Sequence, residues 1–343
     1  MENKKTVILG MSGGVDSSVA LFLLREQGFE VIGVTLKFFK GQDVQIAKKV
    51  CEKYKIRHLT INAGKLFKEK IISYFLKEFK KGRTPSPCIF CNRDVKLELL
   101  FDIAKKEKAQ YISTGHYARI KDGLLLKAKD QTKDQTYFLA FLKKKHLAKL
   151  ILPLGDYTKQ EVYRIAKKEK IKIQEMPSQD LCFITSKIDE FLEKRLGRRK
   201  GKIVDTKGNI IGEHNGIWFY TRGQRRGIRL TQGPFWVKGF DKNNLIVTKD
   251  EKELFSKKVL ISNLNFIVEK PKRPIQVESK IRYRQELAKA VLKITGGSPT
   301  SPRWELVFDK PQRAVTPGQI AVFYQGEVCL GGGVIKKSLI INH

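Results

Sequence analysis

Long apolar runs, cysteine and acidic residues are all scarce in this 343-residue sequence. No uninterrupted apolar run approaches the ~20 residues that a membrane-spanning helix needs, so we expect no membrane association. The first residues show no cleavage-site pattern of a signal peptide. Five cysteines are too few for a secreted disulfide scaffold. These absences predict a cytoplasmic protein.

The shortage of acidic residues leaves a large positive charge. Against 68 Lys and Arg stand only 35 Asp and Glu, which gives a formal net charge of +33. Such a surplus repels itself in a compact chain unless a polyanion balances it, and nucleic acid is the commonest polyanion. The alternative is that the lysines lie on solvated helix faces. With 41% hydrophobic residues, the chain also has enough apolar material for real cores.

The hydrophobic patterns change along the chain. The first half alternates strand and helix patterns, which predicts an α/β fold with a doubly wound parallel sheet. Beyond Gly197, turn signals separate short β-rich runs, and the later runs favour a small antiparallel β-barrel. A Lys- and Pro-rich stretch lies at 270–274. We therefore expect three domains, an α/β domain at 1–197, a small mainly β domain at 198–269 and a barrel at 270–343.

A glycine-rich loop, Ser12-Gly13-Gly14-Val15-Asp16-Ser17, separates the first predicted strand from the first predicted helix. Glycines let the backbone approach a phosphate, and the free N–H groups of a helix N-terminus attract anions. The serine hydroxyls add donors, and Asp16 is suited to Mg²⁺. The lysine of a kinase-type P-loop is absent. The loop therefore predicts binding of ATP and Mg²⁺ by another route.

Cys88 and Cys91 form a CxxC pair before a helix that the pattern predicts from about Asp94 to Lys106. Such a pair is half a zinc site, a redox pair, an iron–sulfur ligand pair or a nucleophile site. No second pair at motif spacing completes a four-ligand zinc site, which leaves Cys182 as the third thiol. Thiolate chemistry needs a lowered thiol pKa near cationic groups, in which the chain is rich.

Thr114-Gly115-His116-Tyr117 follows a predicted strand, at the carboxyl edge where doubly wound sheets bind ligands. With this motif, the chain resembles the bacterial tRNA-specific 2-thiouridylases of the ATP pyrophosphatase (PP-loop) superfamily. The resemblance rests on the glycine-rich loop and on segments found nearly from end to end, namely Cys91-Asn92, Thr114–Tyr117, Lys133–Gln135, Pro153–Asp156, Cys182–Ile184, Tyr220–Arg225, Ile281–Arg284 and Ala314–Gln319.

The resemblance implies an adenine nucleotide alpha hydrolase-like fold for the first domain and a defined chemistry. ATP would adenylate the C2 oxygen of the wobble uridine of tRNA. A persulfide on Cys182 would then supply sulfur, with Cys91 as the partnering nucleophile, after loading by a cysteine desulfurase or a sulfur relay protein. The implied ATP-binding residues are Gly10, Met11, Ser12, Gly13, Gly14, Val15, Asp16, Ser17, Leu36 and Gly115. The implied tRNA-contacting residues are Ser86, Pro87, Cys88, His116, Lys133, Asp134, Gln135, Arg282, Tyr283 and Gln319.

Several alternatives stay open. Many family members carry Asp where this chain has Cys88, so that position is either a bystander or a third ligand. In the second case Cys88, Cys91 and Cys182 would hold a 4Fe–4S cluster whose fourth iron binds sulfide. Tyr283 is predicted either to stack on a splayed base or to fill the barrel core. Alternative functions are another adenylating tRNA modifier, of the lysidine or 4-thiouridine type, and a non-catalytic RNA-binding protein.

Overall fold

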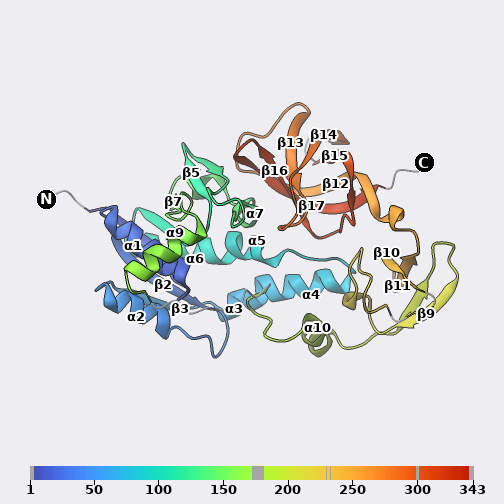
Figure 1. The fold of residues 1–343 in the computed structure, drawn as a ribbon, viewed down its shortest axis with the longest axis horizontal. Coiled ribbons are helices and arrows are strands. Elements are labelled where there is room, and N and C mark those ends of the chain that lie inside the picture. The colour runs from blue at the N-terminus through green and yellow to red at the C-terminus, as the bar shows by residue number, and fades with distance from the viewer. Residues whose placement is uncertain (1–3, 172–180, 229, 232, 299–300, 340–343) are drawn as a thin grey trace.

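Three sheets organise the chain in the computed structural model, which describes residues 4–171, 181–228, 230–231, 233–298 and 301–339. In Figure 1 the first sheet and its helices lie at one end, the barrel and a small sheet lie at the other, and α4 runs between. No helix within the described ranges is long and apolar enough to cross a membrane.

The first sheet is parallel, with strand order β3-β2-β1-β4-β7. In β1 the side chain of Ile8 faces one hydrophobic core, whereas Val7 and Leu9 face another. A strand buried on both faces is typical of a doubly wound sheet, which confirms the predicted fold class. Its strands are β1 (Thr6–Gly10), β2 (Glu30–Lys37), β3 (His58–Asn62), β4 (Tyr111–Thr114) and β7 (Leu150–Ile151).

Helices cover this sheet (Figure 1). The capping box of α9 is present, since Thr158 Oγ1 accepts from Glu161 N and the Glu161 carboxylate accepts from Thr158 N. The helices are α1 (Val15–Glu26), α2 (Gln45–Lys53), α3 (Gly64–Phe67), η1 (Lys68–Ile72), α4 (Ser73–Lys80), α6 (Leu97–Lys106), α7 (Thr136–Leu139), α8 (Lys144–Leu147), α9 (Lys159–Lys168) and α10 (Ile188–Leu196).

The helix predicted to begin near Asp94 begins earlier. It starts as α5 (Pro87–Cys91), passes through a π-helical turn, η2 (Asn92–Lys96), and continues as α6. Pro87 stands in the first turn of α5, where its fixed φ and its missing N–H are favourable. The periodicity argument missed this start because the π turn shifts the helical phase.

A second, smaller sheet follows, with strand order β10-β11-β8-β9. Its core is formed by Ile203, Val237, Leu245 and Val247, which are all fully or almost fully buried. The elements are β8 (Gly201–Val204), β9 (Ile210–His214), η3 (Ile217–Phe219), β10 (Trp236–Asp241) and β11 (Asn244–Thr248), with η4 (Glu251–Leu254) leading to the barrel.

The last sheet closes into a six-stranded antiparallel barrel, because β12 pairs with both β15 and β17. The barrel thus includes a strand before residue 270, where the sequence analysis places the third domain. Its strands are β12 (Phe255–Phe266), β13 (Ile275–Lys280), β14 (Ala288–Ser298), β15 (Ser301–Arg313), β16 (Ile320–Gln325) and β17 (Val328–Leu339).

The barrel and the α/β domain share one core. A hairpin of the first domain, β5 (Arg119–Lys121) and β6 (Leu124–Leu126), extends the barrel sheet by pairing Leu126 with Val328. Tyr137 Oη donates to Ile320 O at 3.0 Å, and the hydroxyls of Thr136 and Tyr324 lie 3.1 Å apart. The barrel is therefore held firmly against the first domain.

Candidate functional site

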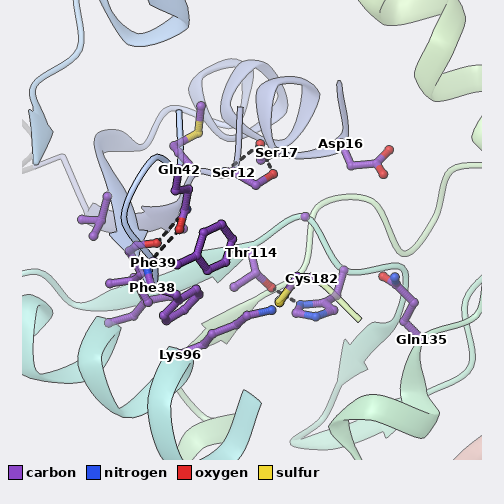
Figure 2. A pocket seen from close by; sticks show the side chains of 17 residues that line it. Ser12, Asp16, Ser17, Phe38, Phe39, Gln42, Lys96, Thr114, Gln135 and Cys182 are labelled. Atoms are coloured by element: carbon purple, nitrogen blue, oxygen red, sulfur yellow. Dashed lines mark hydrogen bonds between the residues drawn. The ribbon is translucent and has the colours of Figure 1, made fainter. Parts of the chain in front are cut away.

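A pocket of about 350 Å³ opens at the carboxyl ends of β1, β2 and β4. It has two parts. The lining of the loop end is Gly10, Met11, Ser12, Asp16 and Ser17, with Val34, Leu36, Phe38, Phe39 and Gln42. The thiol end is formed by Lys96 and Cys182, with Cys88 and Cys91 beside them on α5. Figure 2 shows both ends in one view.

The glycine-rich loop is shaped by its own hydrogen bonds. Ser12 Oγ and Ser17 Oγ lie 3.2 Å apart, Gly14 N donates to Ser12 Oγ at 3.3 Å, and Ser17 Oγ donates to Gly14 O at 3.0 Å. Gly13 has φ +82°, a conformation that favours glycine. The loop therefore presents the N-terminus of α1 to the pocket in a fixed form, which suits a phosphate group.

Gly115 brings the end of β4 against this loop. A Cβ atom on Gly115 would lie 3.0 Å from both the carbonyl carbon of Asp16 and the nitrogen of Ser17, which are backbone atoms that cannot move aside. Only glycine permits this approach. The sequence-predicted loop residues and Gly115 thus come together at one place.

Asp16 is held at the edge of the loop. Its Oδ1 accepts a hydrogen bond from Tyr117 Oη at 2.8 Å and forms an ion pair with Lys159 Nζ at 2.6 Å. Asp16 alone contributes a carboxylate among the residues that line the pocket. One carboxylate joined by substrate phosphates and waters is a usual environment for Mg²⁺, so this side chain fits the predicted metal.

Flat apolar side chains form the opposite wall of the loop end. Phe38 and Phe39 lie there with Leu36, and Gln42 fixes their segment by accepting from Phe38 N at 2.9 Å and donating to Leu36 O at 3.1 Å. Such a wall suits a planar aromatic ligand such as a nucleobase. The sequence analysis names only Leu36, because the phenylalanines belong to no motif.

The thiol end is centred on Lys96. This residue ends the π turn that follows Cys91, and π turns are frequent at functional sites. In Figure 2 the Lys96 ammonium points toward the Cys182 sulfur. Cys88 and Cys91 lie close enough to feel the same charges, since both Lys96 and Cys182 affect the pKa of each thiol.

The thiols are protonated at neutral pH, contrary to the expectation of lowered pKa values. Burial raises the pKa of Cys91 to about 12 and raises the pKa of Cys88, while the Lys96 charge offsets only part of the effect. Cys182 is exposed to the pocket, but the surrounding walls still raise its pKa above the usual value. Burial lowers the pKa of Lys96, yet the three thiols raise it by more.

His116 is a neutral imidazole in this setting. Burial and the nearby Lys96 lower its pKa to about 3, and its Nδ1 lies 2.7 Å from Thr114 Oγ1. It lines the pocket with Gln135, whose Oε1 accepts from Tyr117 N at 2.9 Å. Both residues are therefore placed to contact a ligand without carrying charge.

The three thiols do not surround a site for a single metal ion. Across the part of the chain that the structure describes, no group of three or more His, Cys, Asp or Glu side chains lies close enough to hold a metal ion. The Lys96 ammonium is within electrostatic reach of all three thiols. The 4Fe–4S cluster stays a prediction.

Several predicted tRNA contacts have partners within the protein. Gln319 Nε2 donates to Thr84 O at 3.0 Å, and Arg282 binds the carbonyl of Ala314 and the hydroxyl of Thr316. These bonds hold the barrel turn at 314–319 against the segment that leads into α5. Asp134 is buried and accepts from Ala128 N and from Thr136 Oγ1, whereas Lys133 is exposed.

Of the two places predicted for Tyr283, the barrel core is wrong. The strand β13 ends at Lys280, so the ring leaves the barrel and packs on Phe138 with centroids 4.3 Å apart. Phe138 O in turn accepts from Asn92 Nδ2 at 3.1 Å. Ser86 is likewise engaged, since its hydroxyl bonds to the Tyr137 phenol. These contacts tie the Cys88–Cys91 segment to the barrel.

Three family models match consecutive parts of the chain. A tRNA methyl transferase HUP domain matches residues 5–186, a tRNA methyl transferase PRC-barrel domain matches 189–249, and an aminomethyltransferase beta-barrel domain matches 256–335. The first alone covers more than half of the chain.

Several relatives that match nearly the full length of the chain are named tRNA-specific 2-thiouridylase MnmA. The chain is 40% identical over 363 residues to the tRNA-specific 2-thiouridylase MnmA of Clostridioides difficile, covering 98% of this chain and 99% of that protein. It is 41% identical over 363 residues to MnmA of Acetivibrio thermocellus, with 97% and 100% covered. To MnmA of Aquifex aeolicus it is 40% identical over 361 residues, with 97% and 99% covered.

Solved structures resemble about half of the chain. A 4-thiouridine synthetase–RNA complex with bound ATP matches with a TM-score of 0.36 and 21% identity, over 48% of this chain and 40% of that one. An NH3-dependent NAD synthetase from Campylobacter jejuni matches with a TM-score of 0.32 and 18% identity, over 50% and 66%.

Proposed function

Because the chain belongs to the tRNA-specific 2-thiouridylase family, we propose that it replaces the C2 oxygen of the wobble uridine of tRNA with sulfur at the expense of ATP. One structural observation supports the proposal. The glycine-rich loop and the Cys182 thiol line the same pocket, so an adenylating group and a sulfur-bearing group face one substrate.

The loop end would perform the adenylation. The adenine base lies against Phe38 and Phe39, and the phosphates lie over the N–H groups at the start of α1. The uridine C2 oxygen attacks the α-phosphorus, the bond to the β-phosphate breaks, and pyrophosphate leaves while the base loses its N3 proton. Asp16 would hold Mg²⁺, which neutralises phosphate charge when bound.

The thiol end would perform the sulfur transfer. A protein persulfide first passes its outer sulfur to Cys182 and leaves as a thiol. The terminal sulfur of Cys182 then attacks C2, and AMP departs with the former uridine oxygen. Cys91 attacks the Cys182 sulfur, which breaks the S–S bond, leaves the outer sulfur on C2 and forms a Cys91–Cys182 disulfide. An external thiol reduces that disulfide for the next cycle.

The charge of the protein supports tRNA as the substrate. With a net charge of +33, the chain is suited to a polyanion, and exposed Lys133 stands beside the pocket residue Gln135. His116 and Gln135 add neutral donors and acceptors for a splayed base. The HUP-domain match at residues 5–186 spans the phosphate loop and all three thiols.

Cys88 distinguishes the persulfide route from the cluster route. Because the described thiols do not surround a site for a single metal ion, we derive no step through a cluster. Under the persulfide route, Cys88→Ala retains thiolation, and anaerobically purified protein is active without iron. Iron and sulfide bound in proportion to protein, with both iron and activity lost in Cys88→Ala, would establish the cluster route instead.

The function is tested with purified protein, unmodified tRNA transcript, ATP, Mg²⁺ and a cysteine desulfurase that supplies persulfide. We expect 2-thiouridine at the wobble position, identified by mass and retention against 2-thiouridine and 4-thiouridine standards, together with AMP and pyrophosphate. Cys182→Ser is the matched control, which should release pyrophosphate and leave adenylated tRNA, but form no thionucleoside. A product with sulfur at C4, or AMP formation with a product that lacks sulfur, would contradict the proposal.

A further inference from the structure

Lys159 is a pocket-side cation that no motif and no step above uses. It is the first residue of α9, and its Nζ lies 2.6 Å from Asp16 Oδ1. The ammonium also lies over the rings of Tyr117 and Tyr163, at 5.7 and 4.9 Å from their centroids. Its side chain is 21% exposed, so the charge is partly shielded from water but accessible.

The Asp16–Lys159 ion pair lies on the side of the loop where we expect the outer phosphates of ATP. Phe38, Phe39 and Gln42 lie on one side of the glycine-rich loop, and the Asp16 side chain points away from them on the other side (Figure 2). A nucleotide with its base on the aromatic wall and its α-phosphate over the loop therefore extends its remaining phosphates toward Asp16. Pyrophosphate would leave from that side.

The outer phosphates of ATP, on the Asp16 side of the loop, need a cation to balance their charge. The Asp16 carboxylate repels a polyphosphate, and Lys96, the lysine that lines the pocket, belongs to the thiol end. The backbone of Lys159 is fixed, since its N–H donates to Asp130 Oδ2 at 3.0 Å and the capping box holds the first turn of α9. Only the flexible four-carbon side chain has to move for the ammonium to reach a phosphate.

We propose that Lys159 binds the pyrophosphate portion of ATP, and that Asp16 holds its ammonium in place while no nucleotide is bound. When the Asp16 carboxylate is engaged by Mg²⁺, the ammonium is free to pair with the leaving phosphates, so no charge is left without a partner. This inference rests on the proposed function of the loop end, and it assigns the pyrophosphate half of that site.

The test compares two ligands of the same pocket by calorimetry on the full chain without tRNA. Lys159→Met keeps the apolar stem and removes the charge, and Lys159→Arg keeps the charge. We expect Lys159→Met to weaken magnesium pyrophosphate binding by roughly tenfold or more, as for loss of a charge-assisted contact. Its affinity for AMP should change less than about twofold, and Lys159→Arg should bind pyrophosphate nearly as the unchanged protein does.

Other outcomes overturn the inference and separate it from the proposed function. If Lys159→Met binds both ligands normally, or loses both together, Lys159 is not a pyrophosphate residue. If the unchanged protein binds neither ligand, the proposed function of the loop end fails as well.

A second measurement needs no variant. Acetic anhydride labels lysines in the unchanged protein, and mass spectrometry quantifies the labelling of Lys159 with and without magnesium pyrophosphate. We expect protection of Lys159 but not of Lys129, which pairs with Glu161 on the same helix and serves as the control. Equal labelling of Lys159 in both samples would overturn the inference even if Lys159→Met fails to fold.

Discussion

The phosphate-binding loop at the loop end of the pocket is one short stretch of chain, whereas the thiol end is assembled from separated segments. Residues 10–17 bond among themselves, and one strand-to-helix junction fixes them. Cys88, Cys91 and Lys96 follow a segment held by Gln319 of the barrel, and Cys182 comes from a third region. Local sequence thus determines the phosphate site, while the thiol positions depend on packing between domains.

This difference predicts that damage to one end leaves the other working. The largest effect is expected for Cys182→Ser, which removes the sulfur carrier and should lower thiolation by about 10³-fold or more. Pyrophosphate release in a single turnover with substrate tRNA should stay within a few-fold of normal, because the loop end is untouched. Quench assays that count pyrophosphate and 2-thiouridine in the same sample measure both, and an equal loss of the two would contradict independent ends.

Gly115→Val tests the reverse case, in which the loop end is damaged and the thiol end is left intact. The new side chain would meet the backbone of Asp16 and Ser17, so we expect a loss of roughly 1–3 kcal/mol in the free energy of unfolding and weaker ATP binding. Denaturant melts and ATP titrations measure these effects. Gly239→Val is the matched control, since no atom lies within 4 Å of the added Cβ. Normal ATP affinity in Gly115→Val would show that the close approach is not needed.

Lys96→Met tests whether the Lys96 charge controls the reactivity of the cysteines at the thiol end. The Lys96 charge lowers the pKa of Cys182 and of Cys91, so its removal should move both values further upward. Alkylation requires the thiolate, so its pH profile should shift to higher pH, and the rate at pH 8 should fall several-fold. Peptide mass spectrometry after iodoacetamide measures each thiol, and Lys96→Arg is the control. An unchanged profile would mean that Lys96 does not set thiol reactivity.

Gln319→Leu should have the smallest effect. It removes the hydrogen bond to Thr84 O that ties the barrel to the segment before α5, a loss of about 1 kcal/mol. We expect thiolation to fall about fivefold, with pyrophosphate release in the absence of sulfur donor nearly unchanged. Gln325→Leu, at an exposed position of the same sheet, is the control. A larger loss of tRNA affinity than of thiolation would instead support a direct tRNA contact by Gln319.

The same difference, between local and long-range contacts, decides which features could be predicted from the sequence. The parallel sheet, the glycine-rich loop and the capping box of α9 are visible in the sequence because each depends on neighbouring residues. Tyr283 and Gln319 could not be placed, because their contacts lie on Phe138 and Thr84, far away in the chain. The raised thiol pKa values depend on burial, which no count of basic residues reveals.

Lys96 and Lys159 differ in how readily their roles could have been predicted from the sequence. Lys96 carries a faint signal, since it lies about one helical turn beyond Cys91, but the π turn obscures that spacing. Lys159 meets Asp16 across 143 positions of sequence, and only the folded chain brings them together. The domain bounds and the individual roles of the site residues stay predictions.

The hairpin β5–β6, which extends the barrel sheet through Leu126 and Val328, has a consequence for biosynthesis. The ribosome makes the chain from its N-terminus, so the contacts of Thr136 and Tyr137 with β16 must wait for residues more than 180 positions later. Until then an apolar face of the first domain stays open to water and to other chains. Such late, long-range closure slows folding and favours aggregation of truncated products. Nascent chains arrested before residue 320 should therefore depend on chaperones far more than the finished protein does.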